Sequence, residues 1–346
     1  MNNQTNSAAA MQMEMPPEAV LTNIAFGAMM TQALSVAGKL GIADLLADGE
    51  KTVAELASAT DVHERSLYRI LRSLAGSGVF RETSAQTFAN TPVSDALRRD
   101  AANSMLGGVI FMGEQWHYNV WGNMMHSVKT GKTAWGATHG AEVFDWFAAH
   151  AEEAEIFNRA MTDMSVSVAP FIVEAYDFSG IATLADIAGG HGYLLSQILQ
   201  ANPEMNGVLF DVPPVIAGAA SLLEKESVAE RVETVAGDFF REVPSADAYI
   251  MKHIIHDWDD EKSVAILKNI NRAMAENGKL LIVETVVPEG NEPHYSKLLD
   301  LEMLTSPGGA ERTAEEYRQL LECAGFRLTR IIPTRSPFSI VEAVKA

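Results

Sequence analysis

Cysteine is almost absent from this sequence: Cys323 is the only one in 346 residues. A single thiol cannot build a disulfide framework within the chain or a multi-thiolate metal site. Four histidines, at positions 117, 126, 139 and 150, show no i, i+4 pairing with a second ligand. We therefore expect no disulfide and no metal centre, and we place Cys323 in the core of a helix.

Positive charge is also scarce, since 26 Lys and Arg stand against 45 Asp and Glu, for a formal net charge of −19. This balance opposes nonspecific binding to nucleic acid or to anionic membranes. No uninterrupted apolar run approaches the ~20 residues of a membrane span, and residues 1–15 lack the basic and apolar regions of a signal peptide. We expect a disordered leader over residues 1–15 and a soluble, cytoplasmic protein that acts on small molecules, without nucleic-acid or membrane partners.

The clearest motif is a glycine turn between an apolar run and a helix-compatible segment, TLADIAGGHGYLL at residues 183–195. Glycine permits a close approach of ligand to backbone, and the N-terminus of the following helix presents unpaired N–H groups. One strand later, Asp211 follows Gly192 by 19 residues, about where a carboxylate meets ribose in dinucleotide-binding folds. The sequence predicts a site for an adenosine-containing ligand, with a plain strand-to-helix turn as the alternative.

Two cofactors compete for this turn. The G-x-G-x-x-G pattern of NAD sites would require glycine at position 195, where the chain has leucine. The turn instead resembles the acid-x-G-x-G-x-G motif of S-adenosylmethionine (SAM) methyltransferases. Asp186, Gly190 and Gly192 match that motif, and Ala188 replaces its first glycine. We favour SAM, and an NAD-dependent dehydrogenase remains an alternative with the same fold.

Strand and helix patterns alternate from residue 179 to the C-terminus, which predicts an α/β, Rossmann-like doubly wound sheet. We expect a strand in the apolar run that opens at residue 183, further strands at 207–211, 232–236, 248–252 and 279–287, a helix at 261–275, and a closing hairpin of strands 326–333 and 338–344. The carboxyl ends of such strands collect functional groups. Here they carry Asp211, Asp238, Lys252 and Glu284.

Residues 16–103 are expected to form a mostly helical domain. Two helices are predicted between residues 17 and 48, and the first is apolar on more than one face, which favours packing against a second subunit. A capping-box pattern from Thr52 to Glu55 and a similar one from Asp61 to Glu64 predict a helix-turn-helix, and a hairpin near 79–90 would complete a winged helix.

A winged helix raises the alternative of a DNA-binding regulator. Arg65, Arg69 and Arg72 share one face of the second helix, where major-groove readers place arginines. Residues 50–82, however, contain five acidic and five basic side chains, so no basic patch is expected. We favour a structural winged helix.

Residues 104–178 are predicted to be helical and are crowded with aromatic and Met side chains. Such residues fill cores first, but they can also line a flat aromatic pocket. We interpret this segment as a helical linker and acceptor-pocket region, followed by the SAM-binding catalytic domain over residues 179–346.

Four ordered blocks carry a resemblance to a known family. Residues 251–260, MKHIIHDWDD, resemble the H-D-W block of the caffeic acid type O-methyltransferases and their bacterial natural-product relatives. The blocks at 237–240 (GDFF), 307–313 (PGGAERT) and 157–161 (FNRAM) are similar to further motifs of that family. The resemblance runs from about residue 20 to the C-terminus, and several ordered blocks are more specific than one glycine turn.

The resemblance implies a SAM-dependent O-methyltransferase that works as a homodimer on an aromatic small molecule. His256 would be the general base, with Glu284 and Glu311 holding its ring. The implied cofactor-binding residues are Asp186, Gly189, Gly190, Gly192, Asp211, Val212, Gly237, Asp238, Phe239 and Lys252. The implied acceptor-binding residues are Phe157, Met161, Met164, Trp258 and Met303.

Three positions depart from the plant members: His191 replaces a small residue, Met164 a polar one, and Ser306 an asparagine. They argue against a plant phenylpropanoid as acceptor. Some bacterial relatives methylate nitrogen, and a few have lost methyl transfer for other SAM-dependent chemistry. The presence of His256, Glu284 and Glu311 favours oxygen.

Overall fold

The computed structural model describes residues 15–346, so the predicted leader falls outside the described residues except for Met15. The chain divides into two compact units, one ending at His117 and one starting at Tyr118. Each is described by itself. The domain boundaries expected at residues 103 and 178 stay a prediction.

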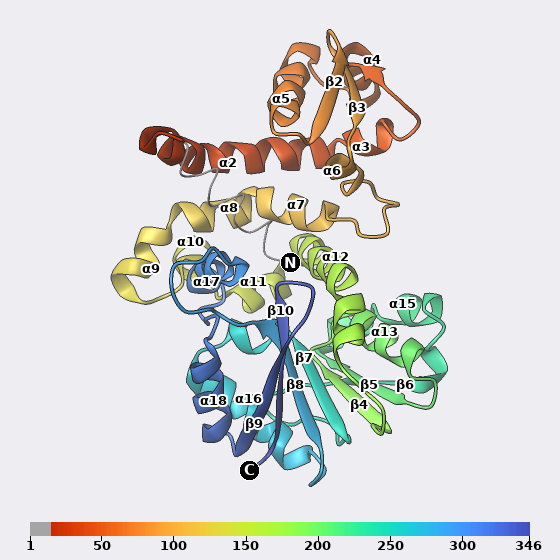
Figure 1. The fold of residues 1–346 in the computed structure, drawn as a ribbon, viewed down its shortest axis with the longest axis vertical. Helices are drawn as coiled ribbons and strands as arrows, with labels where there is room; N and C mark the ends of the chain where they lie inside the picture. Colours follow the sequence, from red (N-terminus) through yellow and green to blue (C-terminus); the bar gives the residue numbers. More distant parts are fainter. Residues whose placement is uncertain (1–14) are drawn as a thin grey trace. The chain divides into compact units, whose positions relative to one another are not determined.

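The first unit is a small helical domain with a three-stranded sheet (Figure 1). Its elements are α2 (Pro17–Lys39), α3 (Ile42–Leu45), β1 (Lys51–Thr52), α4 (Val53–Thr60), α5 (Glu64–Gly76), β2 (Phe80–Ser84), β3 (Thr87–Asn90), α6 (Pro92–Asp95) and α7 (Leu106–Gly113), and α8 (Gln115–Gly122) crosses the boundary. The sheet order is β1-β3-β2 with both pairings antiparallel. The predicted helix-turn-helix and hairpin are therefore both present.

The two predicted caps of this helix-turn-helix differ in outcome. Thr52 and Glu55 form the expected capping box at the start of α4. The cap predicted at Asp61 is wrong, because Asp61 lies at the C-cap of α4 with a φ of 52°, and α5 begins after His63. Because the chain turns in a left-handed conformation at Asp61, the second helix starts at Glu64, later than the pattern predicted.

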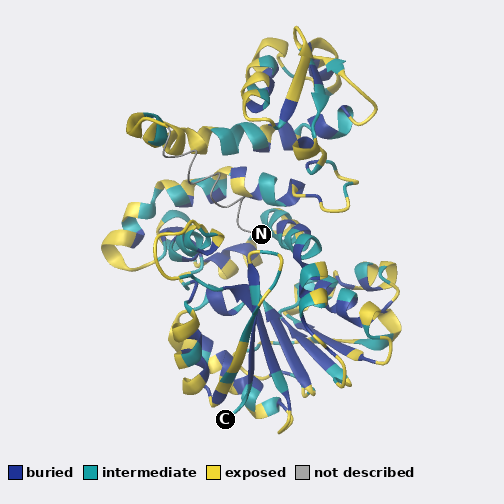
Figure 2. Ribbon diagram, viewed as in Figure 1, coloured by how far each residue is buried: buried dark blue, intermediate teal, exposed yellow. Residues whose placement is uncertain are grey.

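Helix α2 exposes a large apolar surface. Leu21, Ile24 and Met29 are each more than 60% exposed, and most of the first half of the helix is coloured as exposed in Figure 2. By length and composition, α2 is apolar enough to cross a membrane. The uninterrupted-run criterion missed it because polar residues such as Asn23 and Gln32 break the run without outweighing its apolar average. One such helix near an N-terminus is weak evidence of a span.

The second unit is built around a seven-stranded sheet of order β6-β5-β4-β7-β8-β10-β9 (Figure 1). Its strands are β4 (Thr183–Ile187), β5 (Asn206–Asp211), β6 (Val232–Ala236), β7 (Ala248–Lys252), β8 (Lys279–Thr285), β9 (Phe326–Pro333) and β10 (Phe338–Lys345). β4 to β8 pair in parallel, and β10 is antiparallel to both β8 and β9. The predicted doubly wound sheet and its closing hairpin are confirmed.

The second unit also contains helices and short 3-10 turns. They are α9 (Met124–Thr130), α10 (Ala134–His139), α11 (Val143–Ala149), α12 (Ala151–Ala175), α13 (Tyr193–Ala201), α14 (Pro213–Ile216), α15 (Ala220–Lys225), η1 (Ala229–Arg231), η2 (Ile255–Asp257), α16 (Asp260–Ala273), α17 (Tyr295–Thr305) and α18 (Ala314–Cys323). One core cluster joins α12, α13 and α15 to one face of the sheet, and a second joins α16 and α18 to the other. The inner strands β5, β4, β7, β8 and β10 therefore lie between two apolar layers, which leaves their ends as the place for polar groups.

The structure bears on two expectations, which concern a metal centre and the position of Cys323. Within residues 15–346 no group of three or more His, Cys, Asp or Glu side chains is arranged to hold a metal ion. Cys323 is exposed at the end of α18, so its predicted core position is wrong.

Candidate active site

The glycine turn follows β4 and leads into α13, as predicted. Gly190 has a φ of 61°, a left-handed angle that glycine adopts without strain, and space is open where a side chain would start. Its N–H donates to Asp211 Oδ2 at 2.9 Å, and the N–H of Val212 donates to Oδ1 at 2.7 Å. These bonds fix the carboxylate of Asp211 at the end of β5, facing the turn.

Asp186 lies beneath the same turn and is 1% exposed. Its Oδ2 has no hydrogen-bond partner among residues 15–346. Burial raises the pKa of Asp186 to about 7 despite the charge of Lys252, and burial lowers the pKa of Lys252 to about 8 despite the charges of Asp186, Asp257 and Glu284. A buried carboxylate oxygen without a donor, below an open glycine turn, fits a ligand that brings its own donor groups.

Three further cofactor candidates lie at the ends of neighbouring strands. Val212 is exposed at the N-cap of α14. Gly237 follows β6 so closely that an added Cβ would lie 2.5 Å from the Phe210 ring. Asp238 accepts the N–H of Phe240 at 2.9 Å, which forms a tight turn beside Phe239. The predicted cofactor residues thus lie along the carboxyl ends of β4, β5, β6 and β7.

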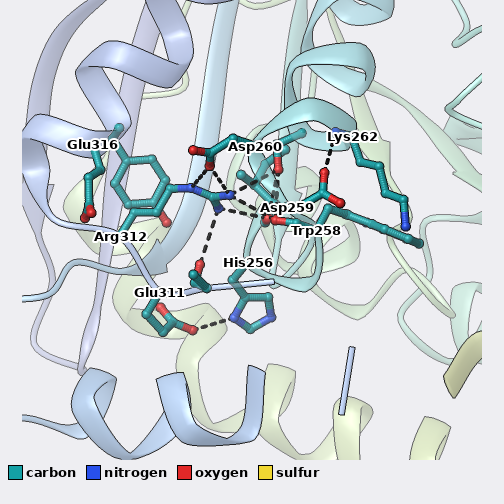
Figure 3. A network of polar contacts seen from close by, with 12 residues as sticks. His256, Trp258, Asp259, Asp260, Lys262, Glu311, Arg312 and Glu316 are labelled. Carbon is teal, nitrogen blue, oxygen red and sulfur yellow. Dashed lines mark hydrogen bonds and ion pairs between the residues drawn. The ribbon is translucent and has the colours of Figure 1, made fainter. Parts of the chain in front are cut away.

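His256 lies in the short turn η2 after β7, rather than inside a helix, and is 3% exposed. Its Nδ1–H donates to Glu311 Oε1 at 2.5 Å (Figure 3). Its other ring nitrogen, Nε2, is 3.5 Å from Asp257 Oδ1. The carboxylate on Nδ1 leaves Nε2 as the nitrogen able to accept a proton.

Glu284 does not hold the imidazole ring, which corrects the expected role. Its Oε1 accepts the backbone N–H groups of Ile254, Ile255 and His256 at 3.1, 2.7 and 3.2 Å. Its Oε2 accepts the hydroxyl of Tyr317. Glu284 is fully buried at the end of β8 and fixes the backbone of the turn that carries His256.

Glu311 is itself held from two sides. Thr285 donates its hydroxyl to Glu311 Oε2, and the backbone N–H of Glu311 donates to Asp300 Oδ1 at 2.9 Å. Just before it, Gly309 packs against the back of the His256 turn, where an added Cβ would lie 2.0 Å from the carbonyl oxygen of His256. This approach explains the second glycine of the P-G-G block.

The surrounding carboxylates decide the ionisation of His256. Burial alone would lower the pKa of its imidazole, but the charge of Asp257, the hydrogen bond to Glu311 and the charge of Glu284 raise it to about 9. Burial raises the pKa of Asp257 to about 7. The ring of His253 lies 4.6 Å from that of His256, and burial and the charge of His256 keep its pKa well below the ordinary value.

The predicted acceptor residues occupy three elements. Phe157, Met161 and Met164 form one half-buried stripe along α12, Met303 is buried in α17, and Trp258 follows the His256 turn. Phe144, which the sequence did not single out, lies against Trp258 with ring centroids 5.4 Å apart. Their contact with an acceptor stays a prediction.

Several residues of the site escaped the sequence analysis. Asp257 received no role from the sequence, although its carboxylate lies 3.5 Å from His256 Nε2. Thr285 and Tyr317 gave no signal, because their partners lie 26 and 33 residues away in the chain. Arg312 was part of the quoted PGGAERT block, but nothing in the block pointed to its contacts.

Comparisons with known proteins agree with this geometry. An O-methyltransferase domain model matches residues 121–327, and an O-methyltransferase dimerisation domain model matches residues 22–100. The chain is 46% identical to a phenazine O-methyltransferase, PhzM, of Lysobacter antibioticus over 95% of this chain and 96% of that protein. It is 36% identical to an 8-amino-8-demethylriboflavin N,N-dimethyltransferase of Streptomyces davaonensis over 89% of this chain and 90% of that protein.

Solved structures show the same likeness. LaPhzM is similar with a TM-score of 0.92 and 45% identity, covering 96% of this chain and all of that one. CalO1, a methyltransferase in calicheamicin biosynthesis solved with S-adenosylhomocysteine (SAH) bound, is similar with a TM-score of 0.85 and 36% identity over 96% of this chain and all of that one.

Proposed function

Because this chain belongs to the SAM-dependent O-methyltransferases that carry a dimerisation domain, we propose that it methylates a hydroxyl group of a fused aromatic natural product, with His256 as general base. The enzyme class and the cofactor follow from the family. The base and the acceptor are the proposal.

The residues around the glycine turn fit SAM. The carboxylates of Asp186 and Asp211 lie beside the turn, and desolvation raises the pKa of both. Asp211 would accept the ribose hydroxyls, Asp238 and Phe239 would lie beside adenine, and Asp186 and Lys252 would border the amino-acid end. When bound, SAM supplies an electrophilic methyl group on its sulfonium.

His256 would remove the acceptor proton through Nε2. Nδ1 cannot do so, because its proton is committed to Glu311 at 2.5 Å. A pKa of about 9 for the imidazole is within about one unit of a phenol, whose pKa is ~10. Proton transfer between the two is therefore nearly balanced, and the carboxylate of Glu311 stabilises the imidazolium as it forms.

One observation carries this proposal: a buried histidine whose Nδ1 is hydrogen-bonded to a buried carboxylate, at the carboxyl edge of the sheet that also bears the cofactor turn. Positioning alone would not require that pair. A buried charged pair is costly unless its geometry is favourable.

The test is methyl transfer from SAM to hydroxyphenazines and to other hydroxylated fused aromatics, with mass spectrometry for a gain of one CH₂ and an assay for released SAH. Matched amino compounds would be assayed in parallel. The proposal is wrong if SAM binds but no hydroxylated acceptor is methylated. Transfer to amines alone would support N-methylation, for which the similarity to the riboflavin-type N,N-dimethyltransferase is the specific reason.

The assembly and location complete the proposal. The dimerisation domain supports a homodimer, and we assign its contact surface to the exposed apolar side chains of α2. We place the protein in the cytoplasm, as expected for an enzyme of small-molecule biosynthesis. That the protein does not bind nucleic acid stays a prediction. A mobility-shift assay with duplex DNA at several salt concentrations would test it.

A further inference from the structure

Arg312 connects the turn that carries His256 to the segment that carries Glu311. It follows Glu311 directly in the chain and is 3% exposed. Its Nη1 donates to the carbonyl oxygen of Ile255 at 3.1 Å, and its Nη2 donates to that of Trp258 at 2.9 Å. These two carbonyls bracket His256 and Asp257 (Figure 3). One planar guanidinium thus spans the ends of the turn that carries the base.

The main chain of Arg312 is fixed as firmly as its side chain. It forms a parallel bridge with Val286, and its carbonyl oxygen accepts the N–H of Val287 at 3.0 Å. Both residues extend β8, which ends with Glu284 and Thr285. The strand that supplies the partners of His256 and Glu311 therefore also anchors the residue that holds the turn.

The remaining contacts of Arg312 are longer or involve an exposed partner. Its Nη1 also donates to the carbonyl oxygen of Ala310 at 3.3 Å, and its Nη2 donates to Ser263 Oγ at 3.4 Å. Nε and Nη2 donate to Asp260 Oδ1 at 3.1 and 2.8 Å, but the Asp260 side chain is 82% exposed. An ion pair with so exposed a partner contributes little. The buried carbonyls are different, because an acceptor left without its donor inside the protein is costly. The position of the guanidinium is thus set by the turn.

We propose that Arg312 is a positioning residue for the reaction: it holds the His256 turn against the Glu311 segment and so sets the contact between His256 Nδ1 and Glu311. This inference rests on the proposed function of His256.

Removing the contacts of Arg312 with the His256 turn should change both the rate of catalysis and the ionisation of His256. A displacement of about 1 Å at a reacting group costs on the order of 10²-fold in rate. The groups that face His256 are Asp257 on its own turn, Glu284 from β8, Glu311, and His253 from the end of β7. A weaker bond to Glu311 removes part of the support for the charged imidazole, so the ring should titrate at lower pH.

The experiment compares Arg312→Gln and Arg312→Lys with Arg318→Gln, which removes a partly exposed arginine of α18 that pairs with Glu315 and Glu322. We expect Arg312→Gln to lower kcat roughly 10²-fold while SAM affinity by calorimetry stays within about threefold. Arg312→Lys should recover part of this loss, because its single ammonium can serve one carbonyl. Arg318→Gln should match the wild type.

A second readout needs no acceptor. Titration of the His256 ring by nuclear magnetic resonance should move to lower pH in Arg312→Gln and remain as in the wild type in Arg318→Gln. The proposal is overturned if the ring titrates unchanged, or if kcat of Arg312→Gln stays within about threefold of wild type. If the glutamine variant does not fold, Arg312→Lys supplies both measurements. Failure of the proposed function would appear separately, as a wild-type enzyme without methyl transfer.

Discussion

His256 is served by two carboxylates that act in different ways. Glu311 bonds the ring nitrogen, whereas Glu284 bonds the backbone of the turn. Glu311 stabilises the imidazolium through a hydrogen bond to the ring, whereas Glu284 stabilises it only through its charge. The second determines where the ring lies. Removing either should lower activity, but only Glu311 is expected to act mainly through proton transfer.

We predict that His256→Ala lowers kcat by roughly 10²- to 10⁴-fold, the usual share of a general base, while the affinity for SAM measured by calorimetry changes little. Wild-type kcat/KM should rise with pH through about 9, because only the neutral imidazole accepts a proton. Glu311→Gln should move this rise to lower pH. A His256→Ala enzyme with more than about a tenth of wild-type kcat would contradict the assignment, since that is only ~1.4 kcal/mol of barrier.

Asp186 illustrates a cost of the cofactor site. Its folded pKa of about 7 is far above the ordinary aspartate value of 3.8. The folded protein therefore keeps a proton that the unfolded chain loses, and stability falls as pH rises from about 4 to 7. Above that window an ionised carboxylate stays buried, which costs at most about 4 kcal/mol.

We predict that Asp186→Asn raises the free energy of unfolding at pH 8 and leaves it nearly unchanged at pH 4, as measured by urea denaturation. SAM affinity should fall at the same time. Asp145→Asn, a change at an exposed position of α11, is the control. Equal stability of Asp186→Asn and the wild type at pH 8 would show that Lys252 already compensates for the carboxylate.

The segments around the base fit together through backbone contacts. The PGGAERT segment approaches the His256 turn closely enough that only a glycine fits at position 309, where an added Cβ would also lie 2.5 Å from Asp257 C and Trp258 N. Backbone atoms cannot rotate away as a flexible side chain can. One of the two segments would have to shift.

Gly309→Ala should therefore lower the melting temperature, by an overpacking cost of about 1–3 kcal/mol, and reduce kcat by roughly 10²-fold as the base moves. Gly122→Ala, where no atom lies within 4 Å of the added Cβ, is the matched control and should behave as the wild type. Thermal melts and initial rates on the same samples decide this. An active and stable Gly309→Ala protein would mean that the two segments lie further apart.

The apolar side of α2 is exposed in a single chain, and this surface bears on how the whole molecule assembles. Leu21 is 68% and Ile24 69% exposed, and monomeric proteins rarely leave such surfaces uncovered. The O-methyltransferase dimerisation domain model matches residues 22–100, which include Ile24. We infer that the second subunit buries them.

We predict that Ile24→Glu converts the dimer to a monomer or lowers its solubility, because a charge would be buried without a partner. Light scattering of the purified protein measures this, with Ala54→Glu on exposed α4 as the control for added charge. A stable Ile24→Glu dimer would move the interface elsewhere. Association with lipid vesicles by the wild type would instead point to a membrane role for α2.

The sequence by itself determined the order of the elements and the chemistry at the strand ends. The predicted strands 232–236, 248–252 and 326–333 have the same bounds in the structure. Apolar runs, glycine turns and capping residues act over a few neighbours, so a local pattern is enough to specify them. The ordered motifs placed His256 and Glu311 in one site because they mark segments that family members hold together.

Only the tertiary structure decided which groups touch. Glu284 meets backbone N–H groups 28 to 30 residues away, and Arg312 spans 54 to 57 residues to reach the same turn. No local pattern encodes such pairs, because they depend on the parallel order of β7 and β8 and on the path of the PGGAERT segment. The raised pKa of His256 has the same origin, since it is the sum of charges that the fold brings together in a buried site, where they are weakly screened.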